Sequence, residues 1–240
     1  MNRIILITGA AKGIGRGIVE ELSKDNENII IANFNKSEKE ATELKEKTGE
    51  NVETYRADIT NKSEVDSMVK YIIDKYGKID VLVNNAGISE VKMFTDITEQ
   101  DWNKMITTNL TGAFFTTKAV TPNMIHNKNG CIINISSIWG IVGGSCEVHY
   151  SAAKAGLIGM SKALAKELGP SNIRVNVIAP GAIDTDMNKG FSEETMEEVK
   201  EETPLRKIGK PVDIARCVKW LIEDEFTTGQ VISPNGGWVI

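Results

Sequence analysis

The sequence predicts an α/β fold in which one doubly wound parallel sheet of about seven strands carries helices on both faces. Short apolar runs alternate along all 240 residues with longer stretches of helical periodicity, which is the pattern of repeated βα units. In addition, no linker, internal repeat or low-complexity segment interrupts this alternation. We therefore expect a single domain over residues 1–240.

The expected strands are seven short apolar runs. In chain order they cover residues 4–8, 29–34, 52–57, 79–84, 131–136, 174–179 and 230–233. Amphipathic helices are expected between them, and the clearest covers 65–76, with Asn61 and Glu64 suited to cap its start. A doubly wound sheet binds its ligand at the carboxyl ends of its strands, near the point where the strand order reverses. Candidate site residues should therefore follow the strands.

The composition argues against several classes of function. The net charge is −5 and the basic residues are spread evenly, so neither a nucleic acid nor a membrane is an expected partner. Cys131, Cys146 and Cys217 show no metal-ligand spacing and only two histidines are present, which predicts reduced thiols and no metal site. The apolar run near the start is too short for a signal peptide or a membrane span, so we expect a cytoplasmic protein.

A glycine-rich segment, TGAAKGIG at residues 8–15, follows the first expected strand and opens a helix. Its glycines allow a tight turn and a close approach to a pyrophosphate, whose charge the helix N-terminus stabilises. The spacing TGxxxGxG differs from GxGxxG and suits a slightly longer loop. The segment predicts a dinucleotide site formed by Gly9, Ala10, Ala11, Lys12, Gly13, Ile14 and Gly15.

Further motifs follow the other strands. Asp58 comes after the third, Asn85-Ala86-Gly87 after the fourth, Ser137 after the fifth and Pro180-Gly181 after the sixth, and Tyr150 and Lys154 form a YxxxK pair. With these motifs, residues 3–240 resemble the single-domain branch of the short-chain dehydrogenase/reductase family, which has a Rossmann-like fold. The resemblance implies an oxidoreductase that reduces a ketone to a secondary alcohol. It also implies that cofactor binding lies mainly in 1–135 and that catalysis and substrate binding lie mainly in 136–240.

The resemblance also implies individual roles. The catalytic residues would be Asn109, Ser137, Tyr150 and Lys154, with Asn109 kinking its long helix around a water that links Lys154 to solvent. Asp58 would hold the adenine, Asn85 to Gly87 would flank the ribose, and Ile183 and Thr185 would contact the nicotinamide side. The implied cofactor site is completed by Ile59, Tyr150, Lys154, Pro180 and Gly181.

The chemistry of ketone reduction explains why a tyrosine and a lysine are needed. A ketone that accepts hydride becomes an alkoxide, so the site must donate a proton. A phenol with a pKa of about 10 exchanges protons poorly at neutral pH unless a cation favours its ionised form. Because Lys154 follows Tyr150 by four residues on one helix face, we expect its ammonium to lower the pKa of Tyr150. Ser137 is expected to bond the substrate oxygen, and Ser136 to be structural.

The choice of cofactor depends on the end of the second strand, where an acidic residue would bind the ribose diol and repel a 2′-phosphate. Asn33, followed by Phe34, stands where NAD-preferring members of the resembled family tend to carry Asp. Lys12 stands where NADP-preferring members often carry a basic residue, although no arginine follows Asn33. We expect NADP(H) to be preferred, with NAD(H) as the alternative.

Within this family, the chain length, the IDTDM segment and the GQVISPNGGW segment resemble 3-oxoacyl-acyl-carrier-protein reductases. The loop before Tyr150 departs from them, because SSIWG followed by SCEV is similar to reductases that complete the 5-aminopentanone modification on bacterial elongation factor P. Candidate substrate residues in this region are Ser137, Trp139 and Glu147. Glu147 has two interpretations, as a charge at a helix N-terminus or as the partner of a substrate ammonium. Trp139 and Trp238 are equally suited to the core and to a pocket wall.

Two other functions on a related fold remain open. A nucleotide-sensing regulator could bind the cofactor without catalysis, but such proteins tend to lose part of the catalytic tetrad. A sugar-nucleotide epimerase would need a TGxxGxxG loop and a larger C-terminal half. The resemblance further implies a homotetramer that acts on a small or carrier-linked ketone.

Overall fold

The sheet has seven parallel strands in the order β3-β2-β1-β4-β5-β6-β7, as the sequence predicts. The computed structural model describes residues 2–188 and 192–240. Its strands are β1 (Arg3–Ile7), β2 (Asn28–Phe34), β3 (Val52–Arg56), β4 (Val81–Asn84), β5 (Gly130–Ile135), β6 (Ile173–Ile178) and β7 (Val231–Ile232). The strand order reverses between β1 and β4, so the crevice at the carboxyl ends of these two strands is the expected ligand site.

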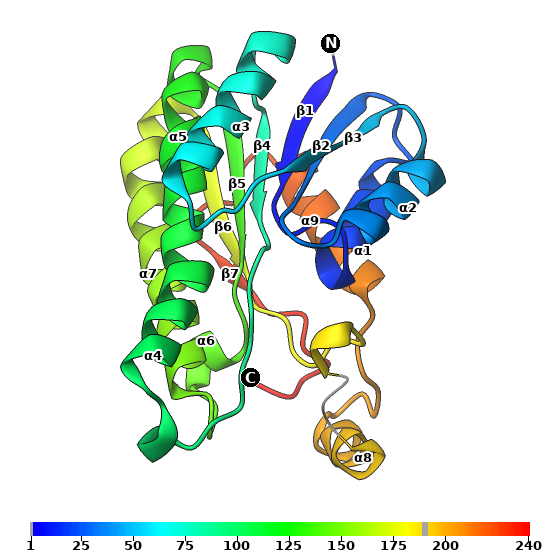
Figure 1. The fold of residues 1–240 in the computed structure, drawn as a ribbon, viewed down its shortest axis with the longest axis vertical. Coiled ribbons are helices and arrows are strands. Elements are labelled where there is room, and N and C mark those ends of the chain that lie inside the picture. Colours follow the sequence, from blue (N-terminus) through cyan, green and yellow to red (C-terminus); the bar gives the residue numbers. More distant parts are fainter. Residues whose placement is uncertain (1, 189–191) are drawn as a thin grey trace.

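Helices cover both faces of the sheet (Figure 1). They are α1 (Gly13–Leu22), α2 (Glu38–Thr48), α3 (Lys62–Tyr76), α4 (Glu99–Ile106), α5 (Gly112–Asn127), α6 (Trp139–Val142), α7 (Val148–Leu168), α8 (Glu193–Glu202) and α9 (Pro211–Glu223). Ile5 and Ile7 of β1 belong to a core with α1, α2 and α9, whereas Ile4 and Leu6 belong to a core with α3, α5 and α7. Successive side chains of a strand point to opposite faces, and here both faces are covered.

Helix α3 begins at the predicted cap. The Asn61 side chain accepts a hydrogen bond of 3.1 Å from the backbone N–H of Ser63. Glu64 accepts one of 2.8 Å from the backbone N–H of Asp58, which ties the start of the helix to the loop after β3. Gly77 ends the helix with a φ of +79°, a left-handed conformation that favours glycine.

Strand β3 ends one residue before its predicted end, and two other strands are two residues shorter than predicted. β4 begins at Val81, because the backbone N–H of Ile79 donates to the Asn123 side chain (3.1 Å) instead of joining the sheet. β7 has only two residues, which pair with Val177 and Ile178 of β6. Beyond the carboxyl ends of the strands lie α6, α8 and a tail segment, residues 233–240, at the bottom of Figure 1. No helix in the described part of the chain is long and apolar enough to cross a membrane.

Candidate active site

The glycine loop joins β1 to α1. Gly9 has a φ of +62°, and a Cβ there would lie 2.7 Å from the Cα of Ala86, so the position requires glycine. A Cβ at Gly15 would collide with the Gly9 carbonyl oxygen. Lys12 is the N-cap of α1, but its side chain makes no capping hydrogen bond. The N–H groups of the first turn are therefore free of a side-chain cap, and the loop fits a pyrophosphate.

The end of β4 holds this loop in place. The Asn85 side chain donates to the carbonyl oxygens of Thr8 (3.0 Å) and Gly9 (3.1 Å). The Thr8 hydroxyl accepts from the backbone N–H groups of Asn85 and Ala86, at 3.0 and 3.1 Å. A cavity of about 760 Å³ adjoins the loop, and Ile183 and Thr185, which are expected on the nicotinamide side, lie in its wall. The wall also contains Ile14, Pro180 and Gly181 of the expected cofactor site.

Asn33 does not present its side chain to the cofactor crevice. The side chain is buried and donates to the carbonyl oxygens of Tyr55 (3.3 Å) and Ala57 (3.0 Å), while its oxygen lies 3.4 Å from the Gly9 nitrogen. The Asn33 amide therefore bonds to the segment formed by β3 and the residue after it, and to the glycine loop. Phe34 is buried as well, in a small cluster with Ala11 and Ala41.

Two lysines lie in the loops that follow β1 and β2. The ammonium of Lys12 pairs with the Glu40 carboxylate at 2.7 Å, and this hydrogen bond raises the pKa of Lys12. Sequence reasoning missed Lys36, which follows β2 by two residues and lies close enough to Asp58 to help lower the pKa of that carboxyl. Its positive charge and its place directly after a strand are the sequence features that indicate it.

Asp58 is held in its ionised form. Burial raises its pKa, but hydrogen bonds from the Thr60 hydroxyl (2.7 Å) and backbone N–H (2.9 Å) outweigh this, and the pKa is lowered overall. Ile59, the next residue, is buried against Gly112 of α5, where a Cβ would lie 3.0 Å from its Cγ1. The pair thus offers a fixed acceptor at the adenine end, while its apolar member secures the loop.

Ser137, Tyr150 and Lys154 come together beyond the end of β5, and all three are buried. The Ser137 hydroxyl lies close enough to the phenol of Tyr150 for their hydrogen bond to act to lower the pKa of Tyr150. The ammonium nitrogen of Lys154 lies 5.6 Å from the centre of the Tyr150 ring and donates to the carbonyl oxygen of Ile135 at 2.8 Å. The Ser136 hydroxyl bonds the backbone of Lys154 at 2.9 Å, which confirms its expected structural role.

Burial dominates the pKa values of the tyrosine and the lysine. It raises the pKa of Tyr150 to about 12, although the hydrogen bond from Ser137 acts in the opposite direction. It lowers the pKa of Lys154 to about 8. The expectation that Lys154 lowers the pKa of Tyr150 is wrong for this structure, because burial disfavours the charged form of both groups. Tyr150 therefore holds its proton at neutral pH and can donate it.

Asn109 lies in a π-helical turn, Thr107–Thr111, between α4 and α5. Its side-chain nitrogen donates to the Ile88 carbonyl (3.0 Å), and its oxygen accepts from the Ile88 N–H (3.1 Å). A Cβ on Gly87 would lie 2.5 Å from the Asn109 oxygen and 3.4 Å from the Lys154 nitrogen, so glycine leaves room for both groups. The irregular turn agrees with the expected break in the helix at Asn109.

The loop before α7 brings Trp139 and Glu147 into the wall of the same cavity. Glu147 is the N-cap of α7 but makes no capping hydrogen bond, and its carboxylate accepts from the Ser89 hydroxyl at 2.9 Å. Burial raises the pKa of Glu147, while hydrogen bonds from Ser89 and Trp139 act in the opposite direction. Glu147 thus lies at a helix N-terminus, as the first of its two interpretations requires, although it makes no capping hydrogen bond.

Together these groups can donate hydrogen bonds and a proton to an oxygen atom of a ligand in the cavity. The hydroxyls of Ser137 and Tyr150 meet in the wall of an otherwise largely apolar cavity beside the glycine loop. Within residues 2–188 and 192–240, no group of three or more His, Cys, Asp and Glu side chains is arranged to hold a metal ion.

Curated relatives cover the whole chain. Residues 9–239 match the family model described as enoyl-(acyl carrier protein) reductase. The 3-oxoacyl-[acyl-carrier-protein] reductase FabG of Thermotoga maritima is 40% identical over 243 residues, which span 100% of this chain and 98% of that protein. The protein of the same name from Staphylococcus epidermidis is 38% identical, over 99% of both chains. The one from Chlamydia muridarum is 40% identical, over 99% of this chain and 97% of its own.

A solved structure agrees with this assignment. The chain described as ElxO with NADP bound superposes with a TM-score of 0.91 and 34% identity, over 99% of each chain. The family match, the full-length relatives and the strand-end motifs support one conclusion. The chain belongs to the short-chain dehydrogenase/reductase family.

Proposed function

We propose that this protein is an NADP(H)-dependent reductase that converts a 3-oxoacyl group, linked to acyl carrier protein, into its 3-hydroxy form. The observation that carries the proposal is the meeting of the Ser137 and Tyr150 hydroxyls in the cavity wall, with Lys154 buried behind them. Two hydroxyl donors side by side in a cavity wall suit a carbonyl oxygen. The names of the full-length relatives support the acyl-carrier substrate.

Each member of the tetrad has a separate task in this proposal. A bound nicotinamide cofactor supplies the hydride. Ser137 donates a hydrogen bond to the ketone oxygen, and Tyr150 gives that oxygen its proton. Lys154 stabilises the phenolate that Tyr150 leaves, and Asn109 keeps the polar path behind Lys154 open next to Gly87. The Tyr150 pKa of about 12 keeps the proton available at neutral pH.

The remaining site residues hold the cofactor. The loop from Gly9 to Gly15 and the start of α1 bind the pyrophosphate. Asp58 accepts from the adenine, Asn85 to Gly87 flank the ribose, and Ile183 and Thr185 contact the nicotinamide side. Lys12 and Lys36 are the cations available to a 2′-phosphate, which favours NADP(H) over NAD(H). Residues 1–135 thus serve mainly cofactor binding and 136–240 mainly catalysis, in one domain of a cytoplasmic homotetramer.

A panel of ketones, assayed by loss of reduced-cofactor absorbance with NADPH and NADH in parallel, tests the proposal. We expect acetoacetyl-carrier protein to be reduced faster than unrelated cyclic or aromatic ketones, and NADPH to be preferred. Tight NADPH binding without turnover of any ketone would instead indicate a nucleotide-sensing regulator on the same fold. Equal rates with all ketones would contradict the carrier-linked substrate.

A second candidate function is reduction of an aminoketone, such as the 5-aminopentanone group on elongation factor P. The Glu147 carboxylate favours it, because it lies in the cavity wall and is half-buried. Among the described residues of that wall, the carboxylates are Glu90 and Glu147, and no lysine, arginine or histidine accompanies them. A substrate ammonium would relieve the cost of burying Glu147.

Glu147→Gln separates the two candidates. A charge-assisted contact is worth about 1.5 to 3 kcal/mol, so the aminoketone candidate requires KM for a cationic aminoketone to rise roughly tenfold to a hundredfold. A neutral ketone of the same length serves as the control and should respond by less than about twofold. If Glu147→Gln changes KM for both substrates by the same factor, the result favours the acyl-carrier function over the aminoketone function.

A further inference from the structure

Two tryptophans from distant parts of the sequence meet at the cavity. Trp139 begins α6 and Trp238 lies in the tail segment, and both line the cavity wall. Their ring centres are 5.4 Å apart with an angle of 65° between the planes, which is an edge-to-face contact. Aromatic pairs of this geometry gain energy beyond the area they bury. The contact therefore joins the tail to the loop that carries Ser137.

Both indoles are held in place by further contacts. The Trp139 ring lies directly against the backbone of Gly144, where a Cβ would be 2.9 Å from the ring. The Trp139 side chain also bonds the Glu147 carboxylate. The indole N–H of Trp238 donates to the Glu202 carboxylate, at the end of α8, at 3.2 Å. These contacts fix both indoles in place, and the pair forms part of the cavity wall between α6 and α8.

Hydrogen bonds and packing contacts also hold the tail segment around Trp238 in place. The backbone N–H of Leu205 donates to the carbonyl of Gly236 at 3.1 Å, and the N–H of Gly237 donates to the Asn235 side chain at 2.7 Å. A Cβ on Gly236 would collide with the Thr203 side chain, so this part of the tail lies against the residues that follow α8. Movement of Trp238 away from a ligand would have to break these contacts.

The position of the pair relative to the catalytic hydroxyls suggests its role. Ser137 and Tyr150 lie at the carboxyl ends of the strands, whereas the tail crosses beyond those ends, between α6 and α8 (Figure 1). The two hydroxyls and the two indoles line one cavity, which is the space open to the chain of a ketone bound by these hydroxyls. A chain long enough to cross this cavity toward the tail would meet the indoles.

We propose that Trp139 and Trp238 limit the length of the apolar chain that the site accepts. The inference rests on the proposed ketone reduction and adds its substrate class: short 3-oxoacyl groups in preference to long ones. Each methylene that enters an apolar cavity contributes about 0.8 kcal/mol, or roughly fourfold in binding. Binding should therefore strengthen with each added carbon until the chain reaches the indoles, and then weaken.

The experiment uses a series of neutral N-acetylcysteamine thioesters with chains of increasing length. For the 3-hydroxyacyl members, Kd is measured by calorimetry in the presence of NADPH, a combination that cannot react, and for the 3-oxoacyl members kcat/KM is measured with NADPH. We expect Trp238→Ala to move the chain length of tightest binding upward by at least two carbons. Beyond the wild-type optimum, its affinity should exceed that of the wild type by about tenfold. Trp238→Phe, which keeps an aromatic ring, should move the optimum less.

Trp220→Ala is the matched control, because it also removes one indole but Trp220 lies on α9, exposed and outside the cavity wall. Its optimum should equal that of the wild type. An unchanged optimum in both Trp238→Ala and Trp238→Phe would overturn the length limit, even if turnover continues. If the wild type turned over no 3-oxoacyl member while Trp238→Ala still shifted the binding optimum, the reductase function would be overturned and the length limit would stand.

Discussion

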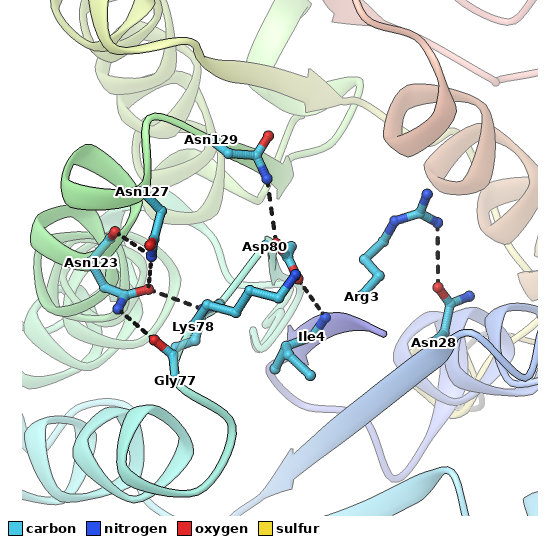
Figure 2. Close-up of polar contacts among 10 residues, drawn as sticks. Arg3, Ile4, Asn28, Gly77, Lys78, Asp80, Asn123, Asn127 and Asn129 are labelled. Atoms are coloured by element: carbon cyan, nitrogen blue, oxygen red, sulfur yellow. Dashed lines mark hydrogen bonds and ion pairs between the residues drawn. The ribbon is translucent and has the colours of Figure 1, made fainter. Parts of the chain in front are cut away.

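The two ends of the same sheet carry polar groups of different character. At the amino end, Asp80 accepts hydrogen bonds from the Ile4 N–H (2.8 Å) and the Asn129 side chain (3.3 Å), and it pairs with Lys78 at 2.9 Å (Figure 2). At the carboxyl end, Tyr150 and Lys154 are buried with their pKa values displaced toward the neutral forms. The first set stabilises the fold, and the second can exchange protons with a ligand.

The amides of the amino end illustrate the same difference. Asn123 accepts from the Ile79 N–H (3.1 Å) and donates to the Gly77 carbonyl (3.2 Å), and Asn127 donates to the Asn123 backbone oxygen (2.9 Å) (Figure 2). These side chains connect the end of α3, the start of β4 and the end of α5. At the carboxyl end, by contrast, the hydroxyls and the Glu147 carboxylate border an open cavity. Perturbed titratable groups beside a cavity are typical of catalytic sites.

The sharpest test of this contrast is Tyr150→Phe. It removes the proposed proton donor and leaves the glycine loop intact, so we expect turnover to fall by about 10² to 10⁴ while cofactor binding persists. Steady-state kinetics and a fluorescence titration with NADPH measure the two effects. Turnover within tenfold of the wild type would remove Tyr150 from the proposed role.

A substitution at the amino end of the sheet should lower the stability of the protein and leave turnover nearly unchanged. Asp80→Ala leaves the Ile4 N–H and the Lys78 ammonium without their acceptor, and we expect a loss of about 1 to 3 kcal/mol in the free energy of unfolding. The value of kcat should stay within about twofold, because Asp80 lies at the far end of the sheet. Urea denaturation and kinetics at a temperature where both proteins are folded provide the measurements. A parallel loss of kcat would mean that the two ends are coupled.

Sequence reasoning succeeded where the signal was local. The strands, the glycine loop and the strand-end positions of Asp58, Asn85 and Ser137 follow from short apolar runs and the residues after them. It could not give the orientation of the Asn33 side chain, because that orientation depends on bonds to β3 and to Gly9, which are distant in the sequence. The packing that determines an orientation of this kind is tertiary.

The pKa values and the tryptophan pair were beyond sequence reasoning for the same reason. Spacing predicted that Tyr150 and Lys154 share a helix face, but burial by the rest of the fold decides their protonation. Likewise, nothing near Trp139 in the sequence indicates that Trp238 lies 5.4 Å away.

The lowered pKa of Lys154 predicts how stability depends on pH. Above about pH 8 the folded protein releases the Lys154 proton, whereas the unfolded chain keeps it up to a pKa near 10.5. The wild type should therefore gain stability relative to Lys154→Met as pH rises from 7.5 to 9.5, by about 1 to 2 kcal/mol. Denaturation curves of both proteins across this range measure the gain. A constant difference would show that Lys154 keeps an ordinary pKa in the fold.

The smallest expected effect concerns the adenosine end, where a charged pair is partly exposed. Lys12 is bound to Glu40, and either the glutamate or a 2′-phosphate can accept from its ammonium. Lys12→Glu should weaken NADPH binding by about fivefold to tenfold more than NADH binding, since exposed ion pairs contribute only about 0.2 to 1 kcal/mol and the reversed charge also repels the phosphate. Glu40→Gln should have the opposite effect and strengthen NADPH binding by up to about threefold, because it removes a competing acceptor.

Both variants are measured by titration with each cofactor at two salt concentrations, and the difference in affinity between the cofactors should shrink as salt increases. If Lys12→Glu weakens NADPH and NADH equally, Lys12 does not face the phosphate, and Lys36 becomes the better candidate for that contact.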